Sequence, residues 1–276
     1  MKTIIIQSIC LLVIIGLGYF LYNIDYKKLS VKSVVSIAIF AILRSVLALL
    51  SLTIPLFGFP SLRIGIGQLP LILGGIALGP FNAFILGLVA DLIGLIINPT
   101  GFPFLGFTLG NILCAVIPAL IANKYKGDYR KLMIGLLAVF SFMFLSIIIV
   151  TSEIIVQNNG ESVVVTLGFL TKLLLTGGLA LIIASLIFNY RLLKKRAEGN
   201  DFYIVLISVV LVELIVNVIM TPIWLEIMFD IPFWTSSLIR VIKMAVMIFV
   251  ETYLIYALLR FLRKSGISLP FFRKNS

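Results

Sequence analysis

The segment from Leu62 to Pro118 constrains the fold more than any other, because it is almost wholly apolar and yet contains one aspartate, Asp91. A short polar loop, residues 98–101, divides it into runs long enough to cross a bilayer as helices. An ionisable residue at membrane depth is costly, and it is by default a functional-site hypothesis. The segment therefore predicts membrane helices that enclose at least one polar site.

The composition excludes an ordinary soluble domain. Charged residues make up 12% of the 276 positions and hydrophobic residues 61%, whereas a soluble domain carries about 25% charged residues. The mean hydropathy is +1.21. We therefore expect an all-α integral membrane protein, because a helix satisfies its own backbone groups inside a bilayer. The apolar runs predict nine spans, at residues 3–22, 33–52, 64–79, 82–97, 104–122, 132–150, 163–188, 202–220 and 236–260.

The basic residues predict the orientation of these spans. Most of the 22 lysines and arginines fall on one side of the nine-span arrangement, whereas Lys2 and Arg63 fall on the other. The positive-inside rule then puts the amino terminus outside and the carboxyl terminus in the cytoplasm. The net charge of +11 thus indicates topology and not a nucleic-acid partner. The residues on the basic side are Lys27, Lys28, Lys32, Lys124, Lys126, Arg130, Lys131, Arg191, Lys194, Lys195, Arg196, Arg260, Arg263, Lys264, Arg273 and Lys274.

The residue types present argue against catalysis. The chain has no histidine, which removes the usual general base and the commonest metal ligand. Cys10 and Cys114 fall inside predicted spans, so they indicate neither a disulfide framework nor a cysteine-rich metal site. The first span has no small-x-small cleavage pattern and is expected to be a retained helix. We expect no enzyme activity, no metal and no cofactor.

The spans group into four regions. The hairpin at 132–188 lacks the glycine and proline punctuation of the segment 62–118, so it is expected to be an insertion. The regions are an extra helix with a basic loop (1–32), core helices one to four (33–122), the inserted hairpin with basic loops (123–201), and core helices five and six with a basic tail (202–276).

Parts of the chain resemble the substrate-binding (S) components of energy-coupling factor (ECF) transporters, in particular the folate-type branch. The resemblance rests on PSLRIGIGQLPLILGGIALGP (60–80), on LGLVADLIGLIINPTGFPFLGFTLGN (86–111), and on the pairing of NVIMTPIW (217–224) with RVIKMAVMIFVETYLIYALL (240–259). Six predicted spans match the family's core helices in order, and the first span and the hairpin are additions. The matching spans are 33–52, 64–79, 82–97, 104–122, 202–220 and 236–260.

The resemblance implies a subunit of the bacterial plasma membrane that captures a vitamin on its outer side and does not alter it. Its partners would be a transmembrane coupling protein and two ATPases. Folate is the first candidate ligand, and pantothenate, thiamine or a queuosine precursor are alternatives. An enzyme acting on a lipid phosphate is less favoured, because the predicted cytoplasmic loops carry only lone acids. A transporter working alone predicts inverted repeats, and none is visible.

The last predicted span places Arg240, Lys243 and Glu251 on one face, because their spacing follows the helical period. Two cations at membrane depth suit an anionic ligand, since charge-assisted contacts are strong where water is scarce. The alternative is that both cations pair internally with Glu213 or Asp91. The sequence leaves the two interpretations open.

A second stripe consists of Glu213, Asn217, Thr221 and Trp224 at intervals of 4, 4 and 3 residues. Asn217 and Thr221 offer hydrogen bonds, and Trp224 offers a flat surface for a heteroaromatic ring. Trp224 fits the aromatic belt of a membrane protein equally well, whereas Trp234 is expected to belong to that belt.

Asp91 shares a helical face with Gly87 and Gly94, and these glycines predict close approach of a neighbouring helix. Two roles stay open for the carboxylate. It either accepts from the amino-pyrimidine edge of a ligand or supports the pocket by bonding to Thr108, Asn111 or a cation. Asn111 is itself a candidate ligand contact.

Two segments are candidate lids over a ligand. Loop 53–63 holds two prolines and a glycine, and Arg63 at its end either attracts an anion or reaches lipid headgroups. Loop 98–106 holds Thr100 and precedes Phe107, which either contacts the ligand or anchors the chain in the membrane.

The second span carries small residues at Ala38, Ala41 and Ser45, which let helices pack closely. In the resembled family, small residues on this helix help to dock the coupling protein. Arg44 in the same span and Lys172 each need an internal acid or water. The sequence names no unique partner for either.

Overall fold

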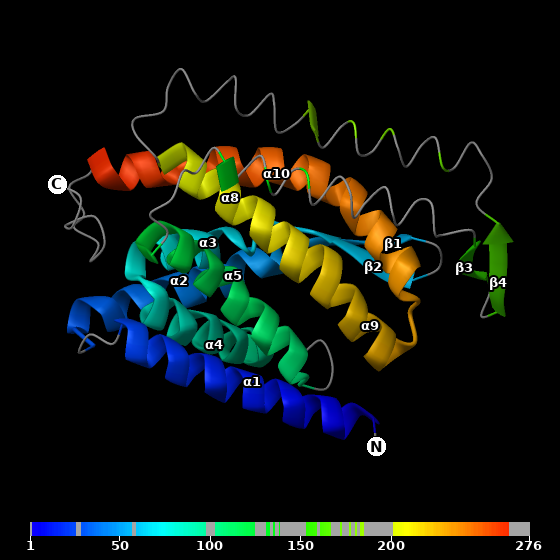
Figure 1. Ribbon diagram of the computed structural model, residues 1–276, viewed down its shortest axis with the longest axis horizontal. Helices are drawn as coiled ribbons and strands as arrows, with labels where there is room; N and C mark the ends of the chain where they lie inside the picture. Colours follow the sequence, from blue (N-terminus) through cyan, green and yellow to red (C-terminus); the bar gives the residue numbers. More distant parts are fainter. Residues whose placement is uncertain are drawn as a thin grey trace. The chain divides into compact units, whose positions relative to one another are not determined.

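The computed structural model divides the chain into two compact units, which are described separately (Figure 1). Unit 1 comprises residues 1–51, 65–126 and 254–276, and unit 2 comprises residues 52–64 and 127–253. The structure describes residues 2–25, 29–56, 59–97, 103–124, 131–132, 135, 138, 153–158, 161–166, 172, 177, 180, 183–184 and 201–264.

Unit 1 contains five whole helices that pack on one another, together with the end of the last helix of the chain. They are α1 (Lys2–Asp25), α2 (Val31–Leu49), α3 (Leu69–Leu78), α4 (Pro80–Ile97) and α5 (Leu105–Lys124). Helix α2 begins after Ser30, whose hydroxyl accepts from the Ser33 amide at 3.1 Å and caps the first turn. Helices α3 and α4 meet at Gly79, whose φ of 86° lies where a side chain would be strained.

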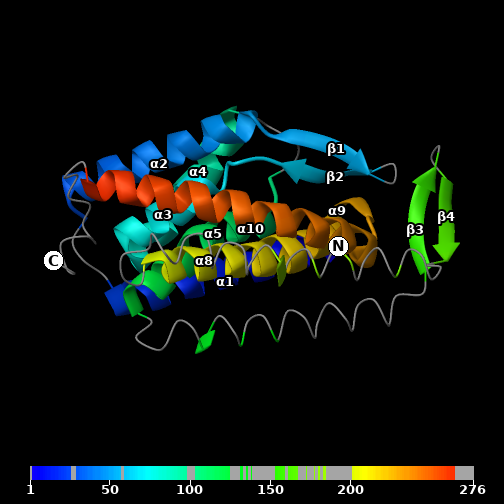
Figure 2. The same ribbon diagram turned by 90° about the horizontal axis from the view of Figure 1, so that it is seen from above.

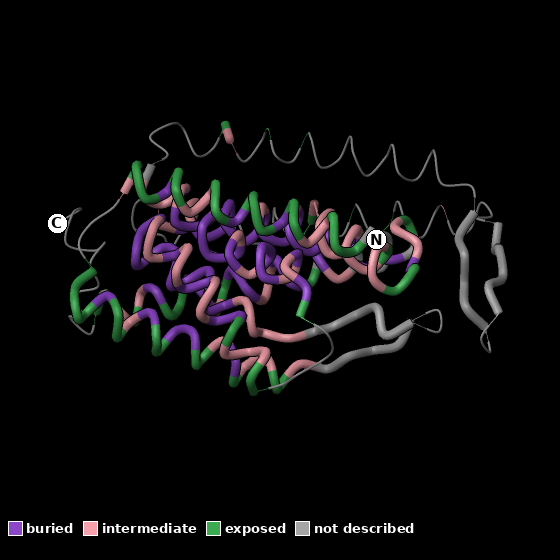
Figure 3. Tube along the Cα trace, turned by 90° about the horizontal axis from the view of Figure 1, so that it is seen from below, coloured by how far each residue is buried: buried purple, intermediate pink, exposed green. Residues whose placement is uncertain are grey.

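Helix α3 forms the centre of unit 1, because each of its residues is buried. It packs against α2, α4 and α5, and Figure 3 marks the buried residues in purple along the tube. Helices α1 and α2 instead expose apolar faces, with Ile4 72% and Val31 80% exposed. A large exposed apolar surface is what a lipid-facing helix requires.

The additional helix α1 packs on α4 and α5. The rings of Tyr22 and Phe81 meet edge to face with centroids 5.6 Å apart, and Gly18 leaves room for the ring of Phe84. Gln7 also donates to the carbonyl of Pro103 at 3.4 Å. The first span is therefore an integral part of unit 1.

Unit 2 contains two antiparallel hairpins and the helices of the carboxyl-terminal region (Figure 2). The first hairpin pairs β1 (Leu52–Leu56) with β2 (Phe59–Ile64), and the second pairs β3 (Glu153–Asn158) with β4 (Glu161–Thr166). A continuous helical run follows, formed by α8 (Asp201–Val212), the π-helix η1 (Glu213–Met220) and α9 (Thr221–Phe229).

The left-handed residue Asp230, with φ 52°, caps α9. The next helix, α10 (Phe233–Lys264), begins in unit 2 and continues into unit 1.

The structure corrects several predicted boundaries. The predicted span 64–79 is a ten-residue helix, because Ile64 lies in β2 and α3 begins at Leu69. The predicted span 163–188 cannot begin at 163, because residues up to Thr166 form β4. The helix predicted for 202–220 runs on to Phe229. The predicted loop 53–63 is largely the β1–β2 hairpin, so the protein is mainly but not wholly helical.

The count of nine spans is not confirmed. Within the described residues, five helices are long and apolar enough to cross a membrane: Thr3–Asp25, Val31–Leu49, Pro80–Ile97, Leu105–Asn123 and Asp201–Phe229. Most of the predicted hairpin 132–188 lies outside the described residues. The coarser prediction of a helical membrane protein is confirmed.

Candidate functional site

In unit 1, three helices contribute to a hydrogen-bonded network around Asp91 of α4. The Thr108 hydroxyl donates to one carboxylate oxygen at 2.7 Å, and the Asn111 amide nitrogen donates to the other at 2.6 Å. Arg44 of α2 donates to the Asn111 oxygen at 2.9 Å. The Asn111 amide therefore links the guanidinium of Arg44 to the carboxylate of Asp91.

The glycines that flank Asp91 make this network possible. A Cβ at Gly87 would collide with the backbone of Ile112, so α4 and α5 approach closely there, as the sequence predicted. A Cβ at Gly94 would lie 2.7 Å from Nη1 of Arg44. Gly94 therefore makes room for a guanidinium and not for a helix backbone.

These contacts bear on the two roles left open for Asp91. The residue is 8% exposed, and each of its oxygens already accepts a hydrogen bond from α5. Buried carboxylates are stabilised when such bonds and a nearby cation compensate for lost hydration. The geometry therefore supports the structural role, and it gives Arg44 the partner that the sequence did not name.

In unit 2, a second cluster of charges joins η1 to α10. Glu213 interacts electrostatically with Lys243 and Arg240 and lies beside Asn217. Arg240 is 7% exposed and donates from Nε to the Ser236 hydroxyl at 3.3 Å. The sequence predicted the pairing of these cations with Glu213 as the alternative to ligand contact, and their electrostatic influence on Glu213 is consistent with that alternative.

The cluster extends further along α10, where Lys243 also interacts with Glu251. Glu213 and Glu251 are both fully buried. None of their four carboxylate oxygens has a hydrogen-bond partner among the described residues. This cluster therefore brings acids and cations within electrostatic range of one another but leaves acceptor capacity open.

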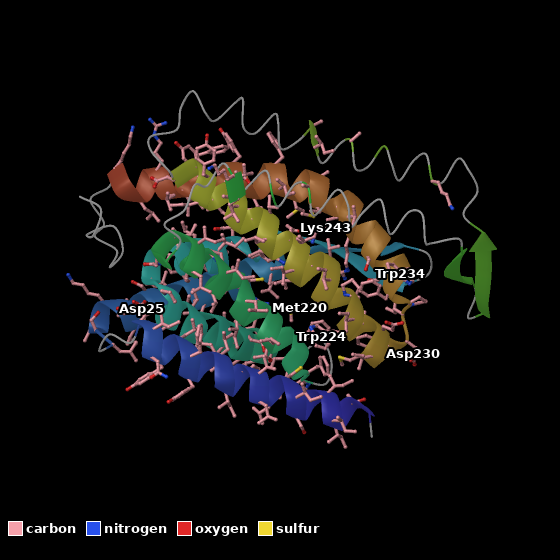
Figure 4. The ribbon with its side chains drawn as sticks, in the orientation of Figure 1. Asp25, Met220, Trp224, Asp230, Trp234 and Lys243 are labelled. Carbon is pink, nitrogen blue, oxygen red and sulfur yellow. The ribbon has the colours of Figure 1, made fainter. Side chains whose placement is uncertain are left out.

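The aromatic and hydroxyl residues of the same region have different environments. Thr221 donates its hydroxyl proton to the Val216 carbonyl at 2.7 Å, within the helical run. Trp224 on α9 is half-buried, and Figure 4 labels it together with Lys243 on α10. Trp234 is 43% exposed and packs edge to face on Phe233, as an aromatic-belt residue would.

The candidate lid residues are only partly described. Arg63 lies in β2, in register with Thr53 of β1. Thr100 lies outside the described residues. Phe107 is half-buried in the first turn of α5, and its ring meets that of Phe104 edge to face at 5.8 Å. A ligand role for these residues stays a prediction.

The predicted docking residues do not share one exposed face. Ala38 is exposed, but Ala41 and Ser45 are 0% and 2% exposed, and the Ser45 hydroxyl donates to the Ala41 carbonyl. Their small side chains serve packing within unit 1. Docking through Ala41 and Ser45 is therefore not compatible with the described structure, and Ala38 alone stays available.

Sequence reasoning missed the importance of Glu251 and the role of Gly94. Glu251 had a usable signal, because it shares a helical face with Lys243 and is an acid at membrane depth. Among the described residues, no group of three or more Cys, Asp and Glu side chains could hold a metal ion.

The comparisons agree with the predicted resemblance. The family described as "ECF transporter, substrate-specific component" matches residues 35–156. The folate transporter FolT of Clostridium novyi (strain NT) is 34% identical over 76 residues, which are 28% of this chain and 44% of the relative. The matched part is thus less than half of that relative's length.

A crystal structure of FolT bound with folic acid is 17% identical, covers 82% of this chain and 93% of its own, and has a TM-score of 0.49. The family match and the FolT relative confirm the resemblance that the sequence predicted. By its sequence, this chain is similar to the substrate-specific components of ECF transporters, of the folate type.

Proposed function

We propose that this protein is the membrane subunit that captures folate for uptake. The observation that carries the proposal is the match of residues 35–156 to the substrate-specific family, with a relative named as a folate transporter. A transmembrane coupling protein and two ATPases would energise release inside the cell. Pantothenate, thiamine and a queuosine precursor remain the alternative ligands.

The charged cluster of unit 2 supports the proposed binding role. Arg240 and Lys243 lie about 10 and 15 Å along α10 from its start, at the helical rise of 1.5 Å per residue. Ionisable residues at this depth are costly unless they are paired or hydrated, and they are therefore functional-site hypotheses by default. We assign Arg240 to the anionic part of the ligand, with Asn217, Thr221 and Trp224 on the facing helical run.

The exposed face of α2 is the proposed contact for the coupling protein. Ala38 lies on this face among exposed residues such as Val35 and Ile42. A small residue there allows a partner helix to approach closely. This assignment replaces the one through Ala41 and Ser45.

The test of the proposed function is extraction and identification of the bound ligand. Protein purified in mild detergent should contain folate or bind added folic acid, and mass spectrometry should recover the ligand unchanged. Recovery of a converted product would contradict a capture role. Recovery of a different vitamin would keep the role but change the ligand. Co-purification with two ATPases would support the proposed partners.

The proposed topology has its own test. A single cysteine at Thr3 in a Cys10→Ser, Cys114→Ser background should react with an impermeant thiol reagent in intact cells, because the amino terminus is expected outside. A cysteine at Ser276 should react only after permeabilisation. The reverse labelling pattern would contradict the proposed orientation.

A further inference from the structure

Two adjacent serines, Ser236 and Ser237, lie near the start of α10, and their exposed fractions are only 0% and 1%. A buried hydroxyl group is costly unless it forms a hydrogen bond. Each of these serines forms one, and the two bonds have different partners. The pair therefore indicates two positions where a hydroxyl group has a specific task.

Ser237 joins α10 to the helical run that precedes it. Its hydroxyl donates to the Val218 carbonyl of η1 at 3.2 Å. Pro222 follows Val218 by four residues and has no N–H with which to bond this carbonyl at the α-helical spacing. Val218 is the neighbour of Asn217 in the sequence. The contact therefore brings the start of α10 against the part of η1 that holds Asn217, a proposed ligand contact.

Ser236 bonds instead to Arg240, about one helical turn further along α10. Nε of Arg240 donates to the Ser236 hydroxyl oxygen at 3.3 Å, and both side chains are buried. A guanidinium group is planar, and its N–H donors form a rigid fork. A bond to Nε therefore restricts rotation of the whole group. A carboxylate that binds this guanidinium through two parallel hydrogen bonds is then directed to the edge formed by the two Nη groups.

We propose that Ser236 is a positioning residue of the ligand site, which holds the guanidinium of Arg240 in the orientation that binds a carboxylate of the ligand. This inference rests on the proposed function, in which Arg240 binds the anionic part of the ligand, and it deepens that function. Ser236 does not contact the ligand itself. Its effect on binding should therefore require both Arg240 and a charged ligand, whereas loss of a merely structural hydroxyl group would weaken the binding of every ligand alike.

The test compares two ligands on full-length proteins in detergent by titration calorimetry. The ligands are folic acid and its diamide, in which both carboxylates are replaced by uncharged amides of similar size. Ser236→Ala should weaken folic acid binding by about three- to tenfold, since one hydrogen bond of ordinary strength is lost. It should leave the binding of the diamide unchanged. In an Arg240→Gln background, Ser236→Ala should cause no further loss of affinity for either ligand.

Ser208 provides the matched control. It is also 0% exposed and lies in unit 2, but its hydroxyl donates to the Ile204 carbonyl of its own helix α8 at 2.6 Å. Ser208→Ala should therefore leave the affinity for both ligands unchanged. Ser236→Cys has nearly the volume of the wild type and replaces the hydroxyl oxygen by a weakly accepting sulfur. It should reproduce the selective loss, and it decides the question even where Ser236→Ala does not fold.

The outcomes separate this inference from the proposed function. Failure of the wild-type protein to bind folic acid would overturn the proposed ligand and the inference with it. Equal wild-type affinity for folic acid and the diamide would overturn the assignment of Arg240 to the anionic part, and again the inference with it. A wild-type preference for folic acid that survives in the Ser236 variants, or an equal loss of affinity for both ligands, would overturn the inference alone.

Discussion

The two units each bury an acid at membrane depth, and they treat it differently. In unit 1, Asp91 accepts from Thr108 and Asn111, and Arg44 supports Asn111 from a third helix. In unit 2, Glu213 has cations nearby, but its oxygens have no hydrogen-bond partner among the described residues.

The difference separates a structural acid from a candidate binding acid. A network whose hydrogen bonds are complete stabilises the fold and has little left to offer a ligand. A buried acid that has cations in its surroundings but lacks hydrogen-bond donors can gain from a ligand that brings them. Substitution of Asp91 or its partners should therefore mainly lower thermal stability. Substitution of Glu213 or the cations near it should mainly lower ligand affinity.

The largest expected effect is that of Asp91→Ala on stability. The substitution removes the acceptors of the Thr108 hydroxyl and of the Asn111 amide in a buried site. A buried donor that loses its acceptor costs about 1–3 kcal/mol, and more when the lost partner is charged. A large fall in the thermal unfolding temperature in detergent is expected, with weaker ligand binding only as a consequence. A stable Asp91→Ala variant that has lost ligand affinity would instead indicate that Asp91 serves in binding.

The next effect concerns the cations of unit 2. Arg240→Gln and Lys243→Gln keep hydrogen-bonding capacity and remove the charge, so each should weaken folic acid binding by about 1.5–3 kcal/mol, roughly ten- to hundredfold. Titration calorimetry and thermal unfolding of the same samples separate affinity from stability. Unchanged affinity with lost stability in both variants would mean that the cations serve only to balance Glu213.

The smallest effects distinguish the two glycines beside Asp91. Gly87→Ala should destabilise unit 1 by about 1–3 kcal/mol, because the new methyl group meets the backbone of α5. Gly94→Ala meets only the flexible end of Arg44. Alanine also favours the helix over glycine by about 0.5–1 kcal/mol. The Gly94→Ala variant should therefore have nearly unchanged stability. Equal losses of thermal stability would show that Arg44 is held rigidly.

The sequence predicted the helical membrane class and the inner helices of unit 1 well, because long apolar runs have few other solutions. It did not predict the hairpins at 52–64 and 153–166. An apolar run such as that around Val163 is compatible with either a strand or the start of a span, and periodicity alone cannot distinguish them.

Some contacts between polar groups were also predicted from the sequence, and others were not. Asp91, Thr108 and Asn111 were correctly associated, since one helical face and one short loop bring them together. The partner of Arg44 was not predictable, because its helix is distant in sequence and only tertiary packing selects Asn111. Helical spacing likewise cannot report which of Ala38 and Ala41 turns toward the interior.

The π-helix η1 has a consequence for how residues are matched between relatives. Its i→i+5 hydrogen bonding accommodates one more residue in a turn than a regular helix does, and Thr221 bonds to Val216 with this spacing. A relative whose helix is regular at this point would align with this chain without a gap before Glu213. After Met220, its residues would be offset from those of this chain by one position. An alignment across η1 therefore needs a single-residue gap, and without it the counterparts of Thr221 and Trp224 would be assigned to the wrong positions.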